Sequence, residues 1–101
     1  MNKKEILVRN IKEARLKYNA LAKQVRVLEI TEKVIKSDIK DVAKVIKKLD
    51  PLTTDHADLS ASVYVSKLQV KQIGELRSLI SDKMAKVDEQ LKRLENELGV
   101  S

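Results

Sequence analysis

One periodic pattern of apolar residues runs through the first half of the chain without a slip. Spacings of four and three residues alternate from Leu7 to Leu49, and Glu32 is the one charged member. The members are Leu7, Ile11, Ala14, Tyr18, Leu21, Val25, Leu28, Glu32, Ile35, Ile39, Val42, Ile46 and Leu49. A heptad pattern sustained over about six heptads predicts one long helix that packs against a partner along its whole length.

The second half carries the same alternation of spacings. Its members are Leu59, Val63, Ser66, Val70, Ile73, Arg77, Ile80, Met84, Val87, Leu91, Leu94 and Leu98. Only Ser66 and Arg77 are polar. The two patterns together predict a coiled-coil seam between two helices of similar length.

The connection between the two patterns predicts how the helices are arranged. Pro51 disfavours helical geometry at Asp50, and turn and capping residues fill the stretch from there to Asp55. We therefore expect helices over 3–49 and 56–98 joined by a turn over 50–55. Because so short a link makes long helices antiparallel neighbours, the predicted fold is an all-α antiparallel helical hairpin, with 1–101 as a single domain.

The helix ends carry recognisable capping signals. Thr54 or Asp55 is expected to cap the start of the second helix, because both side chains accept hydrogen bonds from free backbone N–H groups. Gly99 stands where a left-handed C-cap belongs, and Val100 is expected to close the associated apolar contact. The first helix is expected to begin near Asn2 or Lys3.

Folding the hairpin predicts a set of facing seam residues. The pairs are Ile46 with Leu59, Val42 with Val63, Ile35 with Val70, Leu21 with Met84, and Leu7 with Leu98. A shift by one heptad is the alternative register. In both, Glu32 and Arg77 lie within about one layer of each other, either as an ion pair that fixes the register or with both side chains extended to the edge of the seam.

Two local features leave alternatives open. Residues 59–66 alternate apolar and polar side chains, which taken alone indicates a β-strand, although the heptad pattern continues through them and favours helix. Gly74 lies inside the second helix, where glycine costs ~1 kcal/mol relative to alanine. It marks either a close helix crossing in an oligomer or a tolerated weak point.

A second set of apolar residues lies outside the seam on both helices. Its large members are Leu16, Val27, Ile30, Val34, Val65, Leu68, Leu76 and Leu79. A two-helix monomer would leave them in water, so we expect them to form an assembly face, with a homodimer as a four-helix bundle the simplest arrangement. A helix of a different protein could fill the same place, and scattered surface aliphatics are the alternative without function.

Positive charge is concentrated on the first half of the chain. The net charge is +6, and residues 1–49 hold 14 Lys/Arg against 6 Asp/Glu. Lysines at helical spacing form a stripe of possible phosphate contacts: Lys33, Lys36, Lys40, Lys44 and Lys47, with Lys67 and Lys71 at similar height. The stripe predicts sequence-nonspecific nucleic-acid binding as the alternative function, although Phe and Trp are absent and arginines are few.

Residues with catalytic chemistry are scarce. His56 is the single histidine, and its acidic neighbours sit on the short connection, where solvated helix-end residues are expected. There is no glycine-rich phosphate loop and no metal-ligand spacing, so we expect no enzyme, no cofactor, no metal and no small-molecule substrate. No apolar run is long enough for a membrane span or a signal peptide, which favours a cytoplasmic structural or protein-interaction module.

Overall fold

The computed structural model describes residues 2–99, and these form two long helices. Helix α1 comprises Lys3–Ile46 and α2 comprises Thr54–Leu98, and the two pack against each other. No strand occurs among the described residues. The all-α antiparallel hairpin predicted from the two heptad patterns is therefore confirmed, and residues 59–66 are helical throughout.

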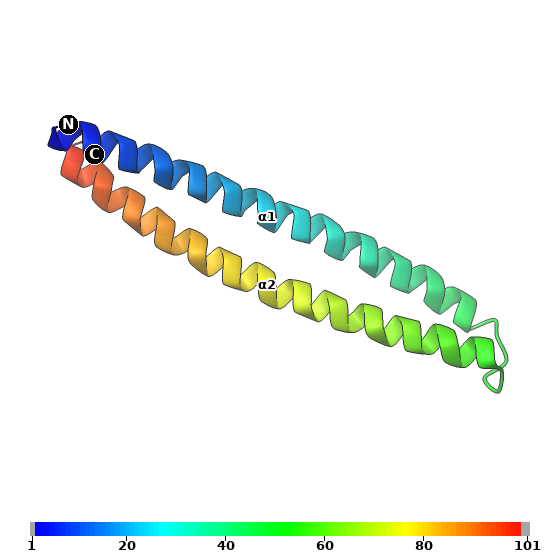
Figure 1. The fold of residues 1–101 in the computed structure, drawn as a ribbon. Helices are drawn as coiled ribbons and strands as arrows, with labels where there is room; N and C mark the ends of the chain where they lie inside the picture. Colours follow the sequence, from blue (N-terminus) through cyan, green and yellow to red (C-terminus); the bar gives the residue numbers. More distant parts are fainter. Residues whose placement is uncertain (1, 100–101) are drawn as a thin grey trace. The chain divides into compact units, whose positions relative to one another are not determined.

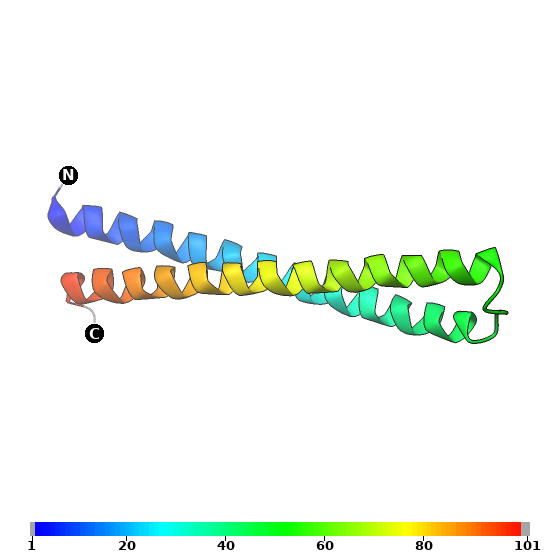
Figure 2. The same cartoon turned by 90° about the horizontal axis from the view of Figure 1, so that it is seen from below.

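The chain divides into two compact units, each built from parts of both helices. Unit 1 joins the chain up to Arg26 with the chain from Ser78 onward, and unit 2 comprises Val27–Arg77 with the connection. In each unit the segment of α1 runs beside the segment of α2 in the opposite direction (Figure 1). Figure 2 shows the same pairing in unit 1, between the blue start of α1 and the orange end of α2.

The seam predicted from the sequence forms the interior of both units. Every seam position on both halves of the chain is buried or half-buried. The most deeply buried apolar side chains all belong to unit 1: Leu7, Ile11, Ala14, Ile80 and Val87. Because most other seam residues are only half-buried, the hairpin leaves much apolar surface within reach of water.

Grooves on the surface of unit 1 agree with the first of the two predicted registers. Leu21 lines one groove with Lys83 and Val87, and Tyr18 lines another with Met84. Both grooves therefore place the segment of α2 around Met84 beside the segment of α1 around Tyr18 and Leu21, as the first register requires. The alternative register would move α2 by a full heptad and bring Leu91 opposite Leu21 instead.

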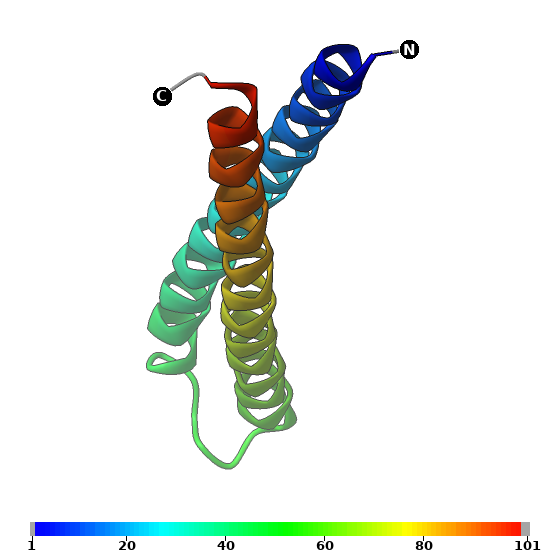
Figure 3. The same cartoon turned by 90° about the vertical axis from the view of Figure 1, so that its left-hand side faces the viewer.

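The connection differs in detail from the prediction. Helix α1 ends at Ile46, and a tighter turn follows in which the Leu49 N–H donates to the Ile46 carbonyl at 3.0 Å. Helix α2 begins at Thr54, two residues before the predicted start. Figure 3 shows this connection looping from the end of α1 back into α2.

The capping residues are partly those expected. Thr53, rather than Thr54 or Asp55, caps α2, because its Oγ1 accepts a hydrogen bond from the His56 N–H at 3.3 Å. At the other end of the helix, Gly99 adopts the predicted left-handed conformation with φ of 82°. The predicted contact of Val100 lies outside the described residues.

Helix α1 also begins where the sequence predicted. The Asn2 side chain caps it by accepting the Glu5 N–H through Oδ1 at 2.8 Å. Glu5 lies in the first turn, where a negative charge is favourable near the free N–H groups. The start of α1 is therefore specified by local side chains.

Candidate interaction faces

The one charged side chain buried among the described residues lies in the seam of unit 2. Glu32 is 9% exposed, and its carboxylate lies between two cations. Arg77 Nη1 is 2.9 Å from Glu32 Oε2, and Lys36 Nζ is 2.8 Å from Glu32 Oε1. The proximity predicted for Glu32 and Arg77 is observed, and the side chains meet in the seam.

The environment of Glu32 favours its charged form. The hydrogen bond from Lys36 has the largest influence and lowers the pKa of the Glu32 carboxyl, burial raises it, and the positive charge of Arg77 lowers it again, so that the pKa lies below its usual value. Glu32 Oε2 is buried without a well-directed hydrogen-bond donor, so its contact with Arg77 is an ion pair.

Lys36 is the member of this cluster that sequence reasoning did not assign to it. It follows Glu32 by four residues on the same helix, a spacing at which opposite charges attract. That spacing could have identified the contact. Helical spacing also places Lys36 in the lysine stripe, and its side chain remains 58% exposed.

All eight large members of the second apolar set are exposed. Their exposed fractions run from 43% at Leu68 to 70% at Leu16. Six of them belong to unit 2, and we call these six the apolar patch: Val27, Ile30, Val34, Val65, Leu68 and Leu76. The other two, Leu16 and Leu79, belong to unit 1.

Heptad positions show on which side of the hairpin each residue lies. With seam residues labelled a and d (Ile11 and Val63 are both a), positions c and g flank one side of the seam and positions b and e the other. In an antiparallel pair, equivalent flanks face each other. Arg15 and Glu95 demonstrate this in unit 1, because both occupy position e and pair at 3.1 Å.

The apolar patch lies on one side of unit 2. Val27, Val34 and Val65 occupy position c and Leu76 position g, while Ile30 and Leu68 occupy the outermost position f. Because the c and g flanks of the two antiparallel helices face each other, α1 and α2 both contribute to one continuous side. We call it the c/g side.

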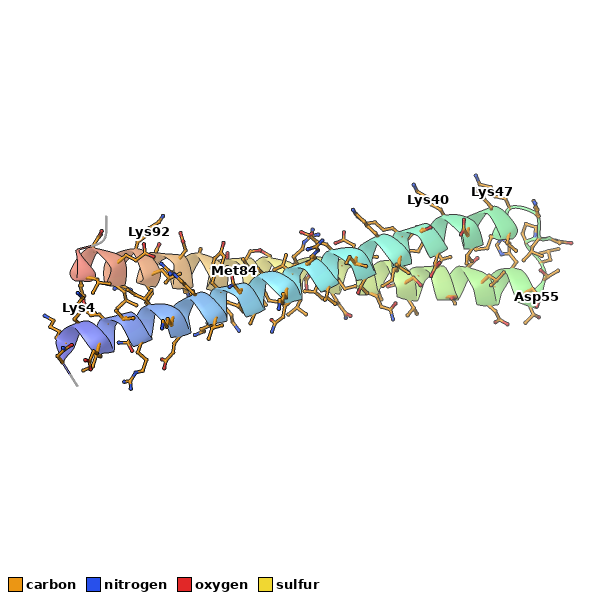
Figure 4. All side chains as sticks on the ribbon, turned by 90° about the horizontal axis from the view of Figure 1, so that it is seen from above. Lys4, Lys40, Lys47, Asp55, Met84 and Lys92 are labelled. Atoms are coloured by element: carbon orange, nitrogen blue, oxygen red, sulfur yellow. The ribbon has the colours of Figure 1, made fainter. Side chains whose placement is uncertain are left out.

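The lysines of the predicted stripe lie mainly on the opposite, b/e side of unit 2. Positions b and e hold Lys33, Lys36, Lys40, Lys47, Lys67 and Lys71, and Lys44 occupies the outermost position f. Figure 4 shows the labelled side chains of Lys40 and Lys47 pointing the same way, away from α2. Unit 2 therefore separates an apolar side from a basic side, which the sequence analysis did not anticipate.

The one histidine and the two tyrosines of the chain lie at separate positions of the two helices. His56 lies in the first turn of α2, and the described part of the chain contains no group of three or more His, Cys, Asp or Glu side chains that could hold a metal ion. Tyr18 is half-buried in the seam, and Tyr64 is exposed at position b. Neither described helix is long and apolar enough to cross a membrane.

Comparisons with known proteins give no relative from which a function could be transferred. The chain matches no family model, no curated protein and no solved structure. The two sides of unit 2 are therefore the features that point to a function.

Proposed function

We propose that this chain is a non-enzymatic structural and protein-interaction module of the cytoplasm that assembles by helix packing on its c/g side. The observation that carries the proposal is the apolar patch, six large aliphatic side chains exposed by 43% to 61%. Contiguous exposed apolar surface of this kind marks interaction sites in proteins that are stable in water. The regular spacing on both helices favours a helical partner.

The energetic gain from covering the apolar patch is distributed over all six residues. Full burial of one such side chain contributes ~1.5–3 kcal/mol, of which about half is already realised in the hairpin. A charged side chain in the centre of the apolar patch would keep its apolar neighbours from being fully buried. It would also lose its own hydration on assembly. One substitution should therefore be enough to break the assembly.

Two neighbouring residues of α2 provide a matched test of this proposal. Val65 belongs to the apolar patch and is 52% exposed, whereas Tyr64 lies on the b/e side and is 64% exposed. Val65→Glu should dissociate the assembly and lower its melting temperature, and Tyr64→Glu, with the same added charge, should do neither. Equal effects of the two variants on the mass in solution would contradict the proposal.

The b/e side supports a second candidate function. Six lysines at helical spacing could neutralise phosphates of a nucleic acid without reading its sequence. Lys33→Glu combined with Lys40→Glu, both at position b, should then abolish the salt-sensitive binding of mixed DNA or RNA and leave the assembly intact. Undiminished binding by that double variant would eliminate the lysine stripe as a nucleic-acid site.

A further inference from the structure

The charges of unit 2 are separated between its two sides, although their sum is small. Residues 27–77 hold nine Lys or Arg side chains against eight Asp or Glu side chains. The b/e side carries six lysines, all exposed, against the single carboxylate of Glu29. The c and g positions of the two helical segments carry no cation and four exposed aspartates: Asp38, Asp41, Asp55 and Asp58.

The remaining charges of unit 2 balance one another. They are Glu32 and Arg77 in the seam, Lys44 and Glu75 at position f, and Lys48 and Asp50 in the connection. The b/e side therefore keeps a surplus of five positive charges and the c/g side a surplus of four negative charges. A polyanion is attracted to the first side of unit 2 and repelled from the second.

The b/e side is suited to binding the phosphates of a nucleic acid but not its bases. Ala43, Ser60 and Gly74 occupy e positions as small, half-buried residues, so part of the surface between the lysines is low. Tyr64 is the one aromatic side chain on this side of unit 2, and no arginine lies there. Stacking on bases and contacts with base edges, which use aromatic and arginine side chains, therefore have almost no support.

We infer that the ligand of the b/e side is a double-stranded nucleic acid, held by its phosphates. This inference rests on the second candidate function and adds the kind of nucleic acid. Lys33, Lys40 and Lys47 follow one another at seven-residue intervals along position b and span about 21 Å. A duplex carries about 12 phosphates over that length of its axis, because both of its strands contribute.

A duplex suits this surface better than a single strand does. It is stiff, so its phosphates are already held in place, as are the helices that carry the lysines. A single strand loses conformational freedom when it lies along fixed charges, and proteins that bind single strands offset this loss by stacking bases on aromatic side chains. The b/e side offers only Tyr64 for stacking.

An exchange of charges between the two sides tests the inference at constant net charge. Lys33→Asp and Lys40→Asp remove cations from the b/e side, and Asp38→Lys and Asp41→Lys place them on the c/g side, so the net charge stays +6. If net charge alone governed binding, the affinity for a short duplex of mixed sequence would not change. Binding along the b/e side predicts a dissociation constant raised at least tenfold, measured by fluorescence anisotropy at fixed salt.

A matched control exchanges the same number of charges on unit 1. Arg9→Asp and Lys23→Asp combined with Asp82→Lys and Glu89→Lys also keep the net charge at +6, and all four residues are exposed at position f. This control should bind the duplex within about threefold of the wild type. Circular dichroism and light scattering compare the helix content and the mass of both exchanged chains with those of the wild type.

A milder variant confined to the b/e side excludes an effect through the c/g side. Among the described residues, Lys36 is the one lysine of the six that forms an ion pair, which leaves five for phosphates. Five contacts predict a slope of about −4 to −5 for the logarithm of the binding constant against the logarithm of the salt concentration. Lys33→Gln combined with Lys40→Gln should make that slope shallower by about two.

Competition identifies the kind of ligand. A labelled duplex bound to the wild-type chain is challenged with unlabelled duplex, with single strands of the same sequence, or with vesicles of phosphatidylserine and phosphatidylcholine. At equal phosphate concentration, the duplex should compete at least tenfold better than either alternative. Equal competition by single strands or vesicles would overturn the duplex as the ligand and leave the lysines as a phosphate-binding surface. An unchanged salt slope in the Lys33→Gln and Lys40→Gln variant would overturn the second candidate function as well.

Discussion

Arg77 Nη1 lies 2.9 Å from Glu32 Oε2, and these two residues are the charged positions in seams that are otherwise apolar or weakly polar. A buried carboxylate is tolerated when cations compensate it, and here Lys36 supplies a second one at 2.8 Å. The cluster joins α1 to α2 within unit 2. It is therefore suited to fixing which layer of one helix faces which layer of the other.

Removing one member of this ion pair should lower the stability of the chain more than replacing both members with apolar residues. Arg77→Ala should lower the melting temperature, because Glu32 then keeps only Lys36. Glu32→Leu combined with Arg77→Leu should restore or raise the melting temperature, since an apolar layer removes the desolvation cost of both charges. Thermal unfolding followed by circular dichroism measures both effects, and a double variant less stable than Arg77→Ala would contradict the account.

The pH dependence of stability should report on Glu32. Because Lys36, and to a smaller extent Arg77, lower the pKa of this carboxyl in the folded chain, its contribution is present above the unfolded pKa of about 4.5 and is lost as the pH falls through the lower folded pKa. Urea unfolding between pH 7 and pH 3 should show a shallower acid destabilisation for Glu32→Gln than for the wild type. Identical slopes below about pH 4.5 would mean that the carboxylate gains nothing from its two partners.

Gly74 should be a weak point of α2. A Cβ at this position would meet no atom within 4 Å, so Gly74→Ala should stabilise the chain by ~1 kcal/mol, a rise in melting temperature of about 4–8 °C. Gly99→Ala is the control, because the φ of 82° there strains an L side chain and should lower stability. A loss of stability in Gly74→Ala would indicate a close crossing with another chain.

The start of α2 offers a pair of adjacent threonines for comparison. Thr53→Ala should cost about 1 kcal/mol, because it removes the oxygen that accepts the His56 N–H. Thr54→Ala should have little effect, because Thr54 already lies inside the helix. Chemical unfolding measures the free energy of unfolding of both variants. If Thr54 were the cap, as the sequence allowed, Thr54→Ala would be the less stable of the two.

The seam could be predicted residue by residue because heptad spacing and burial share one physical cause. Each position of the two patterns from Leu7 to Leu98 is buried or half-buried, and a single slip in the spacing would have put charged side chains there. The helix ends were less predictable. Asp50, Pro51, Thr53, Thr54 and Asp55 offer several competing turns and caps, and the choice among them depends on the geometry of the whole connection.

The two sides of unit 2 could be predicted only in part. The sequence identified the apolar set and the lysine stripe separately, because spacing is counted along one helix at a time. Their placement on opposite sides follows only once the helices are known to be antiparallel, with equivalent flanks in contact, as Arg15 and Glu95 show in unit 1. The grouping of Lys17 with Lys83 and Lys86 around one groove of unit 1 likewise joins residues of two helices that spacing along one helix does not relate.

Self-association through the apolar patch can be tested by the mass of the purified chain in solution, measured by multi-angle light scattering across a range of concentrations. We expect a species of twice 11.5 kDa, which Val65→Glu should convert to the mass of one chain. A wild-type chain that stays at 11.5 kDa at every concentration would contradict self-association through the apolar patch.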